Sequence, residues 1–198
     1  MLNKCFRLSI YLLAMSFLVA CGGAPKKPAI VIEKTVANDK PVLTELDKAN
    51  YQKAVQLLSQ AELDKAESLF TQLVDAHPKL TGAYVNLGVI KKAQNQSEDA
   101  KSWFSRALEI DPNFIDALLQ QALIMQDAGK FTEAEDLLRR AEAINPKHPL
   151  VQYNLGVLYE LYLQEYSLAI KHYEQYVQLS SADDVETVKR WIMLLERK

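Results

Sequence analysis

The chain has 198 residues, of which 49% are apolar and 24% are charged, a composition typical of a globular protein of one or two domains. Lys and Arg number 23 against 25 Asp and Glu, so the formal net charge at pH 7 is −2. A nucleic-acid-binding protein needs clustered basic residues, and this balance argues against that class.

The first twenty residues have the pattern of a secretory signal peptide. Lys4 and Arg7 precede an uncharged run over residues 8–20, which ends in small residues. The run is too short to span a membrane as a helix, whereas a charged start and a short apolar core are typical of a cleaved signal. We therefore predict a signal peptide over residues 1–20.

The residues at the predicted cleavage site, Leu18-Val19-Ala20-Cys21, resemble the lipobox of bacterial lipoproteins. The resemblance implies that Cys21 becomes the lipidated first residue of the mature chain. Gly22 after it favours the periplasmic face of the outer membrane. Two or more acyl chains anchor a protein stably, whereas one chain binds weakly. The alternative is an ordinary signal peptide with an incidental cysteine.

The mature chain is expected to start with a tether. Cys5 lies inside the predicted signal, so only Cys21 remains, and an internal disulfide, a cysteine-based zinc site or a thiol catalyst is excluded. Residues 21–42 contain three of the seven prolines and few large side chains. They predict a flexible segment with a reach of about 25 Å. The short apolar run at 30–32 is alternatively a strand that adds to a partner.

From about residue 43, sets of residues recur at intervals of 34. Each unit has a small residue in its first half, an alanine and then a large apolar residue in its second half, and the first three units close with a proline. A fourth unit carries the alanine and the large residue one position late, which predicts an extra residue in its turn at about 163–166. Asn95 and Gly129 tolerate a left-handed conformation and predict the turns inside units two and three. The recurring positions are Ala54, Gly88, Ala122 and Gly156; Ala66, Ala100, Ala134 and Ala169; Phe70, Phe104, Leu138 and Tyr173; and Pro78, Pro112 and Pro146.

The spacing Tyr84-x2-Leu87-Gly88 and Ala100-x3-Phe104 resembles the tetratricopeptide repeat pattern, from which Lys91 departs at the second aromatic position. The resemblance implies an all-α fold, a right-handed solenoid of about four helix-turn-helix repeats. We place the repeats at 47–80, 81–114, 115–148 and 149–182, within a region 43–182. One such unit cannot bury its own apolar face, so neighbouring units must stack.

Residues 183–198 predict a capping helix. Val185, Val188, Trp191, Ile192 and Leu195 fall on one stripe, with charged residues on the opposite side. A repeat array exposes an apolar end unless such a helix closes it. A groove-binding or dimerising helix is the alternative.

Two columns in the first helices are candidates for a peptide-binding groove, because the family resemblance implies that these places face or border the inner groove. Amides offer both donors and acceptors to the backbone of an extended peptide, and apolar pockets suit its side chains. The alternative is that the amides solvate helix edges and the apolar residues pack between repeats. The amide column is Gln52, Asn86, Gln120 and Asn154; the apolar column is Tyr51, Val85, Leu119 and Tyr153, followed one turn later by Val55, Val89, Leu123 and Val157.

Catalytic and metal-binding motifs are not found in the sequence. The three histidines, His77, His148 and His172, have no spacing that requires a shared metal, and no cofactor is expected. Carboxylate-clamp members of the family bind chaperone termini through basic groove residues. Here Lys48 and Lys92 are the only basic candidates, so that clamp is not expected.

The resulting expectation is a non-catalytic, lipid-anchored adaptor that binds protein or peptide partners in the cell envelope, with no nucleic-acid or small-molecule substrate. Its plan resembles small repeat lipoproteins such as type IV pilus pilotins, which help a secretin assemble in the outer membrane. A scaffold for peptidoglycan hydrolases or synthases is a second hypothesis. An enzyme or accessory subunit that uses His172 in a polar pocket is a third.

Overall fold

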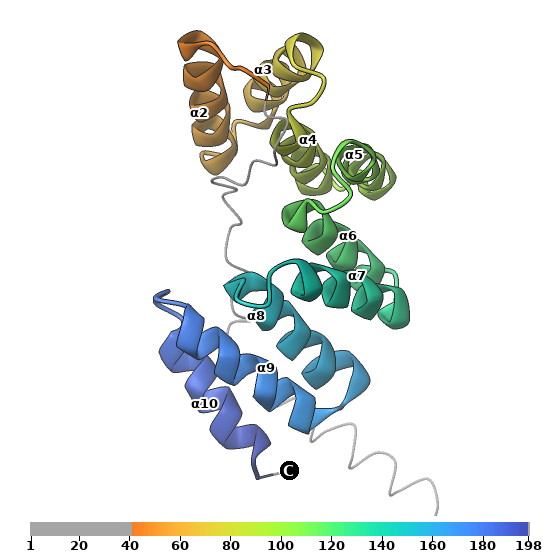
Figure 1. Ribbon diagram of the computed structural model, residues 1–198, viewed down its shortest axis with the longest axis vertical. Coiled ribbons are helices and arrows are strands. Elements are labelled where there is room, and N and C mark those ends of the chain that lie inside the picture. The colour runs from red at the N-terminus through yellow and green to blue at the C-terminus, as the bar shows by residue number, and fades with distance from the viewer. Residues whose placement is uncertain (1–40, 198) are drawn as a thin grey trace, which may run out of the picture. The chain divides into compact units, whose positions relative to one another are not determined.

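The computed structural model describes residues 41–197, and every regular element in this range is a helix (Figure 1). The predicted signal peptide, Cys21 and nearly all of the predicted tether lie outside the described residues. The all-α class is confirmed. The helices are α2 (Glu45–Ser59), α3 (Leu63–Ala76), α4 (Thr81–Ala93), α5 (Ser97–Ile110), α6 (Ile115–Asp127), α7 (Phe131–Ile144), α8 (Pro149–Val157), the π-helix η1 (Leu158–Leu163), α9 (Tyr166–Leu179) and α10 (Val185–Leu195).

The helices form four consecutive pairs, α2 with α3, α4 with α5, α6 with α7, and α8 and η1 with α9. Pro78, Pro112 and Pro146 each lie two residues beyond the end of a second helix, as the spacing predicts. Proline cannot donate a backbone hydrogen bond, and it disfavours a helical conformation at the residue before it. The chain is therefore redirected into the next pair at each of these points.

Each pair contains a tight turn with one residue in the left-handed conformation. Asn95 (φ 61°) and Gly129 (φ 74°) occupy this place in the second and third pairs, where the sequence predicts such turns. Ala61 (φ 59°) and Gln164 (φ 57°) occupy it in the first and fourth pairs. Neither residue type favours positive φ, so the packing of the flanking helices imposes the conformation there.

The extra residue of the fourth unit lies inside the first helix and not in the turn, where the sequence analysis placed it. In the first three pairs a backbone N–H just after the left-handed residue bonds to the carbonyl five residues earlier, as Glu62 does to Leu57 at 2.9 Å. In the fourth pair the N–H of Glu165 reaches the carbonyl of Tyr159, six residues earlier, also at 2.9 Å. The wider turn of η1 absorbs the added residue.

Close contact within a pair depends on the small residue of the first helix. A Cβ atom built on Gly88 would lie 2.3 Å from Cε1 of Phe104, and one built on Gly156 would lie 2.5 Å from the ring of Tyr173. Real Cβ atoms do not approach other atoms this closely, so the aromatic rings fill the space that a side chain would need. Glycine at these two positions lets the second helix lie against the first.

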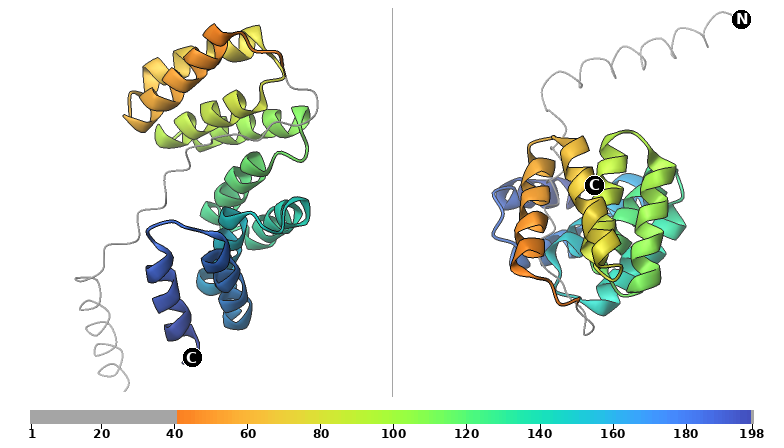
Figure 2. Two further views of the ribbon diagram at one scale, coloured as in Figure 1. Left: turned by 60° about the vertical axis from the view of Figure 1, so that its left-hand side comes forward. Right: turned by 90° about the horizontal axis from the view of Figure 1, so that it is seen from above.

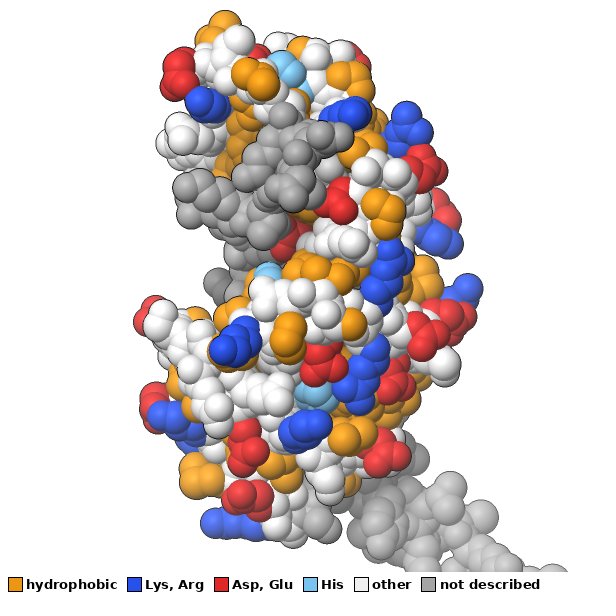
Figure 3. All heavy atoms as spheres, in the orientation of Figure 1, with side chains coloured by type: hydrophobic (Ala, Val, Ile, Leu, Met, Phe, Trp, Pro, Cys, Tyr) orange, Lys and Arg blue, Asp and Glu red, His pale blue; other side chains and the backbone are white. Residues whose placement is uncertain are grey.

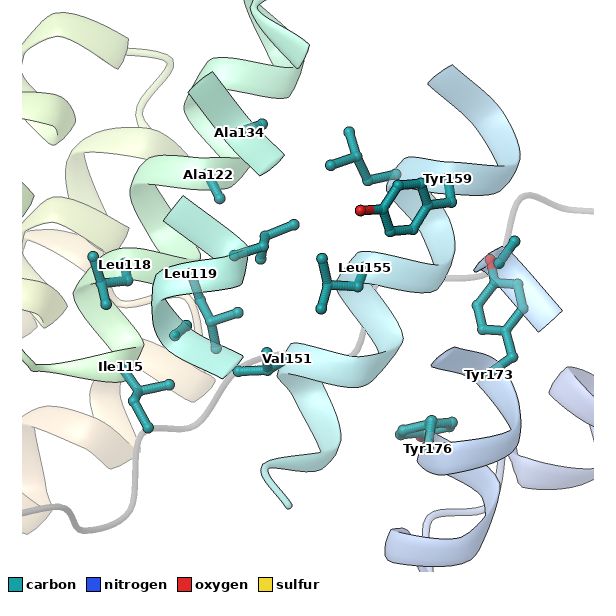
Figure 4. Packing of buried hydrophobic residues seen from close by; sticks show 14 of the residues in the cluster. Ile115, Leu118, Leu119, Ala122, Ala134, Val151, Leu155, Tyr159, Tyr173 and Tyr176 are labelled. Carbon is teal, nitrogen blue, oxygen red and sulfur yellow. The ribbon is translucent and has the colours of Figure 1, made fainter. Parts of the chain in front are cut away.

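Apolar side chains also join successive pairs, as the stacking of repeats requires. One buried cluster runs from α6 through α7, α8 and α9 to α10. Figure 4 shows Leu119 of α6 and Leu155 of α8 directed toward one another, and both are at most 1% exposed. Burial of this kind supplies most of the favourable free energy of an array whose single units are not stable alone.

Helix α10 covers the apolar side of α9 (Figure 2). Val188 and Leu195 of the predicted stripe are buried, and the ring of Trp191 lies 6.0 Å from that of Tyr173. The hydroxyl of Tyr176 donates a hydrogen bond to Asp184 at 2.5 Å, just before the helix. These contacts hold α10 against α9, and its role as a cap of the array stays a prediction.

The other end of the array begins with a capping box. Thr44 accepts a hydrogen bond from the backbone N–H of Asp47, whose carboxylate accepts one from the backbone N–H of Thr44. The same carboxylate lies 3.0 Å from Nε2 of His77, at the end of α3. His77 thereby ties the start of the first helix to the end of the second.

Candidate peptide-binding surface

Equivalent positions of α2, α4, α6 and the continuous segment α8–η1 form a common stripe, which we call the first-helix face. Positions spaced by three, four and seven residues share one side of a helix. Adjacent helices are connected on this stripe, because Nδ2 of Asn86 on α4 donates a hydrogen bond to the hydroxyl of Tyr51 on α2 at 3.0 Å. The face consists of Lys48, Gly82, Asp116 and Leu150; Tyr51, Val85, Leu119 and Tyr153; Gln52, Asn86, Gln120 and Asn154; Val55, Val89, Leu123 and Val157; and Leu58, Lys92, Gln126 and Glu160.

The predicted amide column is largely occupied by contacts within the array. Gln52 is exposed, whereas Asn86, Gln120 and Asn154 are only 2%, 4% and 8% exposed. Nδ2 of Asn86 also donates to the carbonyl of Gly82 at 3.0 Å, and Nδ2 of Asn154 donates to that of Leu150 at 2.7 Å. These two amides therefore fix the first turns of their own helices, and a role in peptide binding stays a prediction.

The two apolar columns differ in accessibility. In the first column Val85 and Leu119 are fully buried, while Tyr51 and Tyr153 are half-buried. In the second column all four residues keep a partly exposed surface. This second column is an apolar stripe that every repeat leaves accessible to a partner. These residues are Val55, Val89, Leu123 and Val157.

Sequence reasoning missed Asp116, the second residue of α6. Its side chain is 9% exposed, and burial raises the pKa of its carboxyl to about 6. Burial also raises the pKa of Tyr51 to about 12, and the charge of Asp116 acts in the same direction. The equivalent residues Lys48, Gly82 and Leu150 share no chemistry with Asp116. The only signal in the sequence is therefore an acidic residue one helical turn before the amide column.

The ion pairs near this face explain the two lysines of α4. Nζ of Lys91 lies 2.6 Å from the carboxylate of Glu67 on α3, and Nζ of Lys92 lies 3.2 Å from that of Asp127 on α6. Both pairs join neighbouring repeats. Basic and acidic side chains are intermixed over the surface that Figure 3 shows.

His172 lies in a polar cluster, but its ring is completely buried. Nδ1 lies 2.7 Å from the Oε1 atom of Gln152 and 3.7 Å from the carboxylate of Glu142, and the ring stacks on that of Tyr159. Burial lowers the pKa of the imidazole to about 4, although the Glu142 charge opposes this shift. The ring is therefore neutral near pH 7, and no substrate can reach it in this conformation.

Two further features bear on chemistry. No three His, Cys, Asp or Glu side chains gather into a potential metal site within residues 41–197. Among the same residues, none of the helices combines the length and the apolar character that crossing a membrane requires.

Comparison with known families gives two matches that together cover residues 57–184. A profile described as tetratricopeptide repeat matches residues 57–124, and a second profile with the same description matches residues 119–184. The matched region starts within α2 and ends just before α10.

Curated relatives share the repeats at low identity. The chain is 24% identical over 152 residues to the uncharacterised protein y4yS of Sinorhizobium fredii, covering 76% of this chain and 82% of that protein. It is 28% identical over 101 residues to the human protein O-mannosyl-transferase TMTC3. That match covers 50% of this chain but only 11% of the human protein.

Solved structures with the same fold include two bacterial proteins. TTC0263 of Thermus thermophilus, described as a thermophilic tetratricopeptide repeat protein, has a TM-score of 0.65 at 22% identity, covering 75% of this chain and 81% of that one. The pilF protein of Pseudomonas aeruginosa has a TM-score of 0.67 at 19% identity, covering 77% and 70% respectively. At these identities the likeness shows the fold alone.

Proposed function

Because the chain belongs to the tetratricopeptide repeat family, whose fold is a scaffold for protein–protein interactions, we propose that it is a non-catalytic adaptor that binds protein partners in the bacterial envelope. The observation that carries the proposal is the half-exposed apolar stripe of Val55, Val89, Leu123 and Val157, present in all four repeats. A partner segment lying across the repeats would contact one such residue from each. The buried His172 offers no comparable site for a substrate.

The proposed location is the periplasmic face of the outer membrane, through lipid on Cys21. The supporting observation is the sequence Leu18-Val19-Ala20-Cys21 after a short apolar run. Several acyl chains on one cysteine bind a membrane stably without a spanning helix. The full-length protein should incorporate labelled palmitate and sediment with outer membranes, and Cys21→Ala should do neither. A wild-type protein that incorporates no palmitate would refute the anchor.

The proposed process is the assembly of a pilus or secretin. Two observations support it: the lipoprotein-plus-repeat plan resembles that of pilotins, and pilF of Pseudomonas aeruginosa has the same fold. This chain would then hold an envelope component through the first-helix face while the lipid keeps it at the membrane. The adaptor would act by binding and positioning, with no chemical step.

The test uses full-length protein purified from native membranes, with associated proteins identified by mass spectrometry. The variant Val89→Gln, Leu123→Gln makes the accessible stripe polar in two repeats. The matched control Ile110→Gln, Ile144→Gln changes the last residues of α5 and α7, which lie 34 apart on second helices. Circular dichroism verifies that both variants keep their helices.

The outcomes separate the hypotheses. Loss of a secretin or pilus component from the first variant, but not from the control, supports the proposed process. Loss of a peptidoglycan hydrolase or synthase instead keeps the adaptor and reassigns it to cell-wall assembly. Identical associated proteins in both variants and the wild type would refute binding through the first-helix face.

A further inference from the structure

Asp116 is a buried carboxylate that has no ion-pair partner among residues 41–197. It is 9% exposed, and it makes no hydrogen bond or ion pair with another residue of the described range. A carboxylate removed from water loses hydration free energy unless donors or a cation replace the water. The raised pKa of Asp116 has burial as its cause, consistent with a group that lacks such a partner.

The other charged residues of the first-helix face are all engaged. Lys48 pairs with Glu45 at 2.7 Å, and Lys92 pairs with Asp127 at 3.2 Å. Glu160 accepts a hydrogen bond from the hydroxyl of Tyr173 at 2.8 Å. Among residues 41–197, Asp116 is thus the one charged side chain of the face for which no hydrogen bond or ion pair is found.

Polar groups from two neighbouring repeats lie beside this charge. The hydroxyl of Tyr51 accepts a hydrogen bond from Asn86 and lies over Gly82, where an added Cβ would come within 2.8 Å of it. Cζ of Phe114, the residue just before α6, lies 4.0 Å from the same built Cβ, so the Tyr51 hydroxyl lies close to the start of α6, where Asp116 is the second residue. Oxygen acceptors are what an ammonium or guanidinium group needs.

A second orphan atom lies on the same face of α6. Nε2 of Gln126 is buried without a hydrogen-bond partner among residues 41–197, and the side chain is 5% exposed. The atom itself is fully buried, so a bound segment cannot reach it in this conformation. Gln126 therefore takes no part in the site at the other end of α6.

We propose that Asp116 and Tyr51 form a subsite of the first-helix face that binds a lysine or arginine side chain of the partner polypeptide. The inference rests on the proposed adaptor function and specifies the chemistry of the partner. Charge complementarity carries it, since a cation satisfies the one carboxylate of the face that lacks a partner in the described range. An acidic segment would meet repulsion at the same place. A metal ion would need more ligands, and none of the residues described provides a cluster of three.

The test measures the binding of two acetylated dipeptide amides, Lys-Leu and norleucine-Leu, to the full chain by NMR titration. The two probes differ only in the ammonium group. The wild type should bind the lysine probe at least tenfold more tightly, because a charge-assisted hydrogen bond is strong where water is excluded. Asp116→Asn should abolish the preference. Asp64→Asn, the second residue of α3 and exposed, should retain it.

Each outcome decides the assignment. Equal binding of the two probes to the wild type overturns the subsite, and so does an undiminished lysine preference in Asp116→Asn. The adaptor function is tested separately, and it stands if the Val89→Gln, Leu123→Gln variant still loses its partner. A lysine preference that appears only in a Lys34→Gln, Lys40→Gln variant assigns the subsite to the N-terminal segment of this chain, and that also overturns the assignment to a partner. A lysine preference that is lost in Asp116→Asn and kept in Asp64→Asn supports the assignment to a partner.

Discussion

The carboxylate of Asp116 has no ion-pair partner among residues 41–197, and this predicts that removing its charge stabilises the protein. The change Asp116→Asn keeps the size of the side chain and removes its ability to ionise. In the folded protein burial raises the pKa of Asp116 to about 6, against a value of 3.8 for the free side chain. The native state therefore holds a proton that the unfolded chain releases at lower pH, and ionisation of the native carboxyl opposes folding.

The magnitude follows from the difference between the two pKa values. Between pH 3.8 and about 6 the folded state binds more protons than the unfolded state, so the free energy of unfolding falls as the pH rises. Above that range the loss is constant, at about 3 kcal/mol for a difference of two pKa units. The carboxylate at the start of α6 also interacts favourably with the helix dipole, by about 0.3–1 kcal/mol. We therefore expect Asp116→Asn to raise the free energy of unfolding by about 2 kcal/mol at pH 7.5.

The measurement is urea denaturation of the wild type and Asp116→Asn at several pH values from 4 to 7.5, followed by circular dichroism. The difference between the two proteins isolates Asp116 from all other titrating groups. It should be small near pH 4, grow up to pH 6 and then stay level. Asp64→Asn is the control at the same position of another helix; because Asp64 is exposed, its removal should change the free energy of unfolding at pH 7.5 by no more than about 0.5 kcal/mol. A variant of Asp116 that is no more stable than the wild type at pH 7.5 would refute the reasoning.

Three further predictions follow from the packing and the turns, each measured by the same denaturation assay. Gly88→Ala places a Cβ 2.3 Å from the ring of Phe104 and should lower the free energy of unfolding by about 2–3 kcal/mol. Gly129→Ala has nothing within 4 Å of its Cβ and should lower it by only about 1 kcal/mol, because of the positive φ. Equal losses in the two variants would contradict the close-contact role of Gly88. Ala61→Gly should raise the free energy of unfolding by about 0.5–1 kcal/mol, because glycine adopts φ 59° without strain, and a loss would show that the turn is not strained. Burial lowers the pKa of His172 to about 4, so below pH 6.5 the unfolded chain binds a proton that the folded protein does not. The free energy of unfolding should therefore fall by up to about 3 kcal/mol as the pH drops from 6.5 to 4, and His172→Gln should remove this dependence.

The sequence predicted the helix pairs because their packing has a periodic signature. Close packing requires a small residue on the first helix opposite a bulky one on the second, as at Gly88 and Phe104, and this pair of residues recurs in each repeat. The ends of the second helices were predictable as well, because Pro78, Pro112 and Pro146 mark them through backbone chemistry alone, and each helix ends two residues before its proline. Features that do not repeat were not predictable in this way. The left-handed Ala61 is one of them, because alanine normally avoids that conformation.

The candidate site was predictable only in outline. Columns of like residues located the first-helix face, but they could not separate the buried Val85 from the half-exposed Val89, because both are valines on the same side of α4. The hydrogen bond between Asn86 and Tyr51 joins two columns that the sequence analysis treated independently. Asp116 was not predictable, because it stands out by its burial without an ion-pair partner among residues 41–197, and neither property has a sequence signature.

The π-helix η1 has a consequence for how such arrays evolve. A one-residue insertion in a helix ordinarily rotates every later side chain by about 100°, which would turn the apolar face of the unit away from its neighbours. Here the wide turn over Leu158–Leu163 takes up the insertion before the chain enters α9, and Ala169 and Tyr173 still reach buried positions. The length of a repeat can therefore change by one residue while its packing contacts are kept. An alignment of the repeat sequences with a strict period of 34 would place the second helix of this repeat one residue out of register, although its helices pack like those of the other repeats.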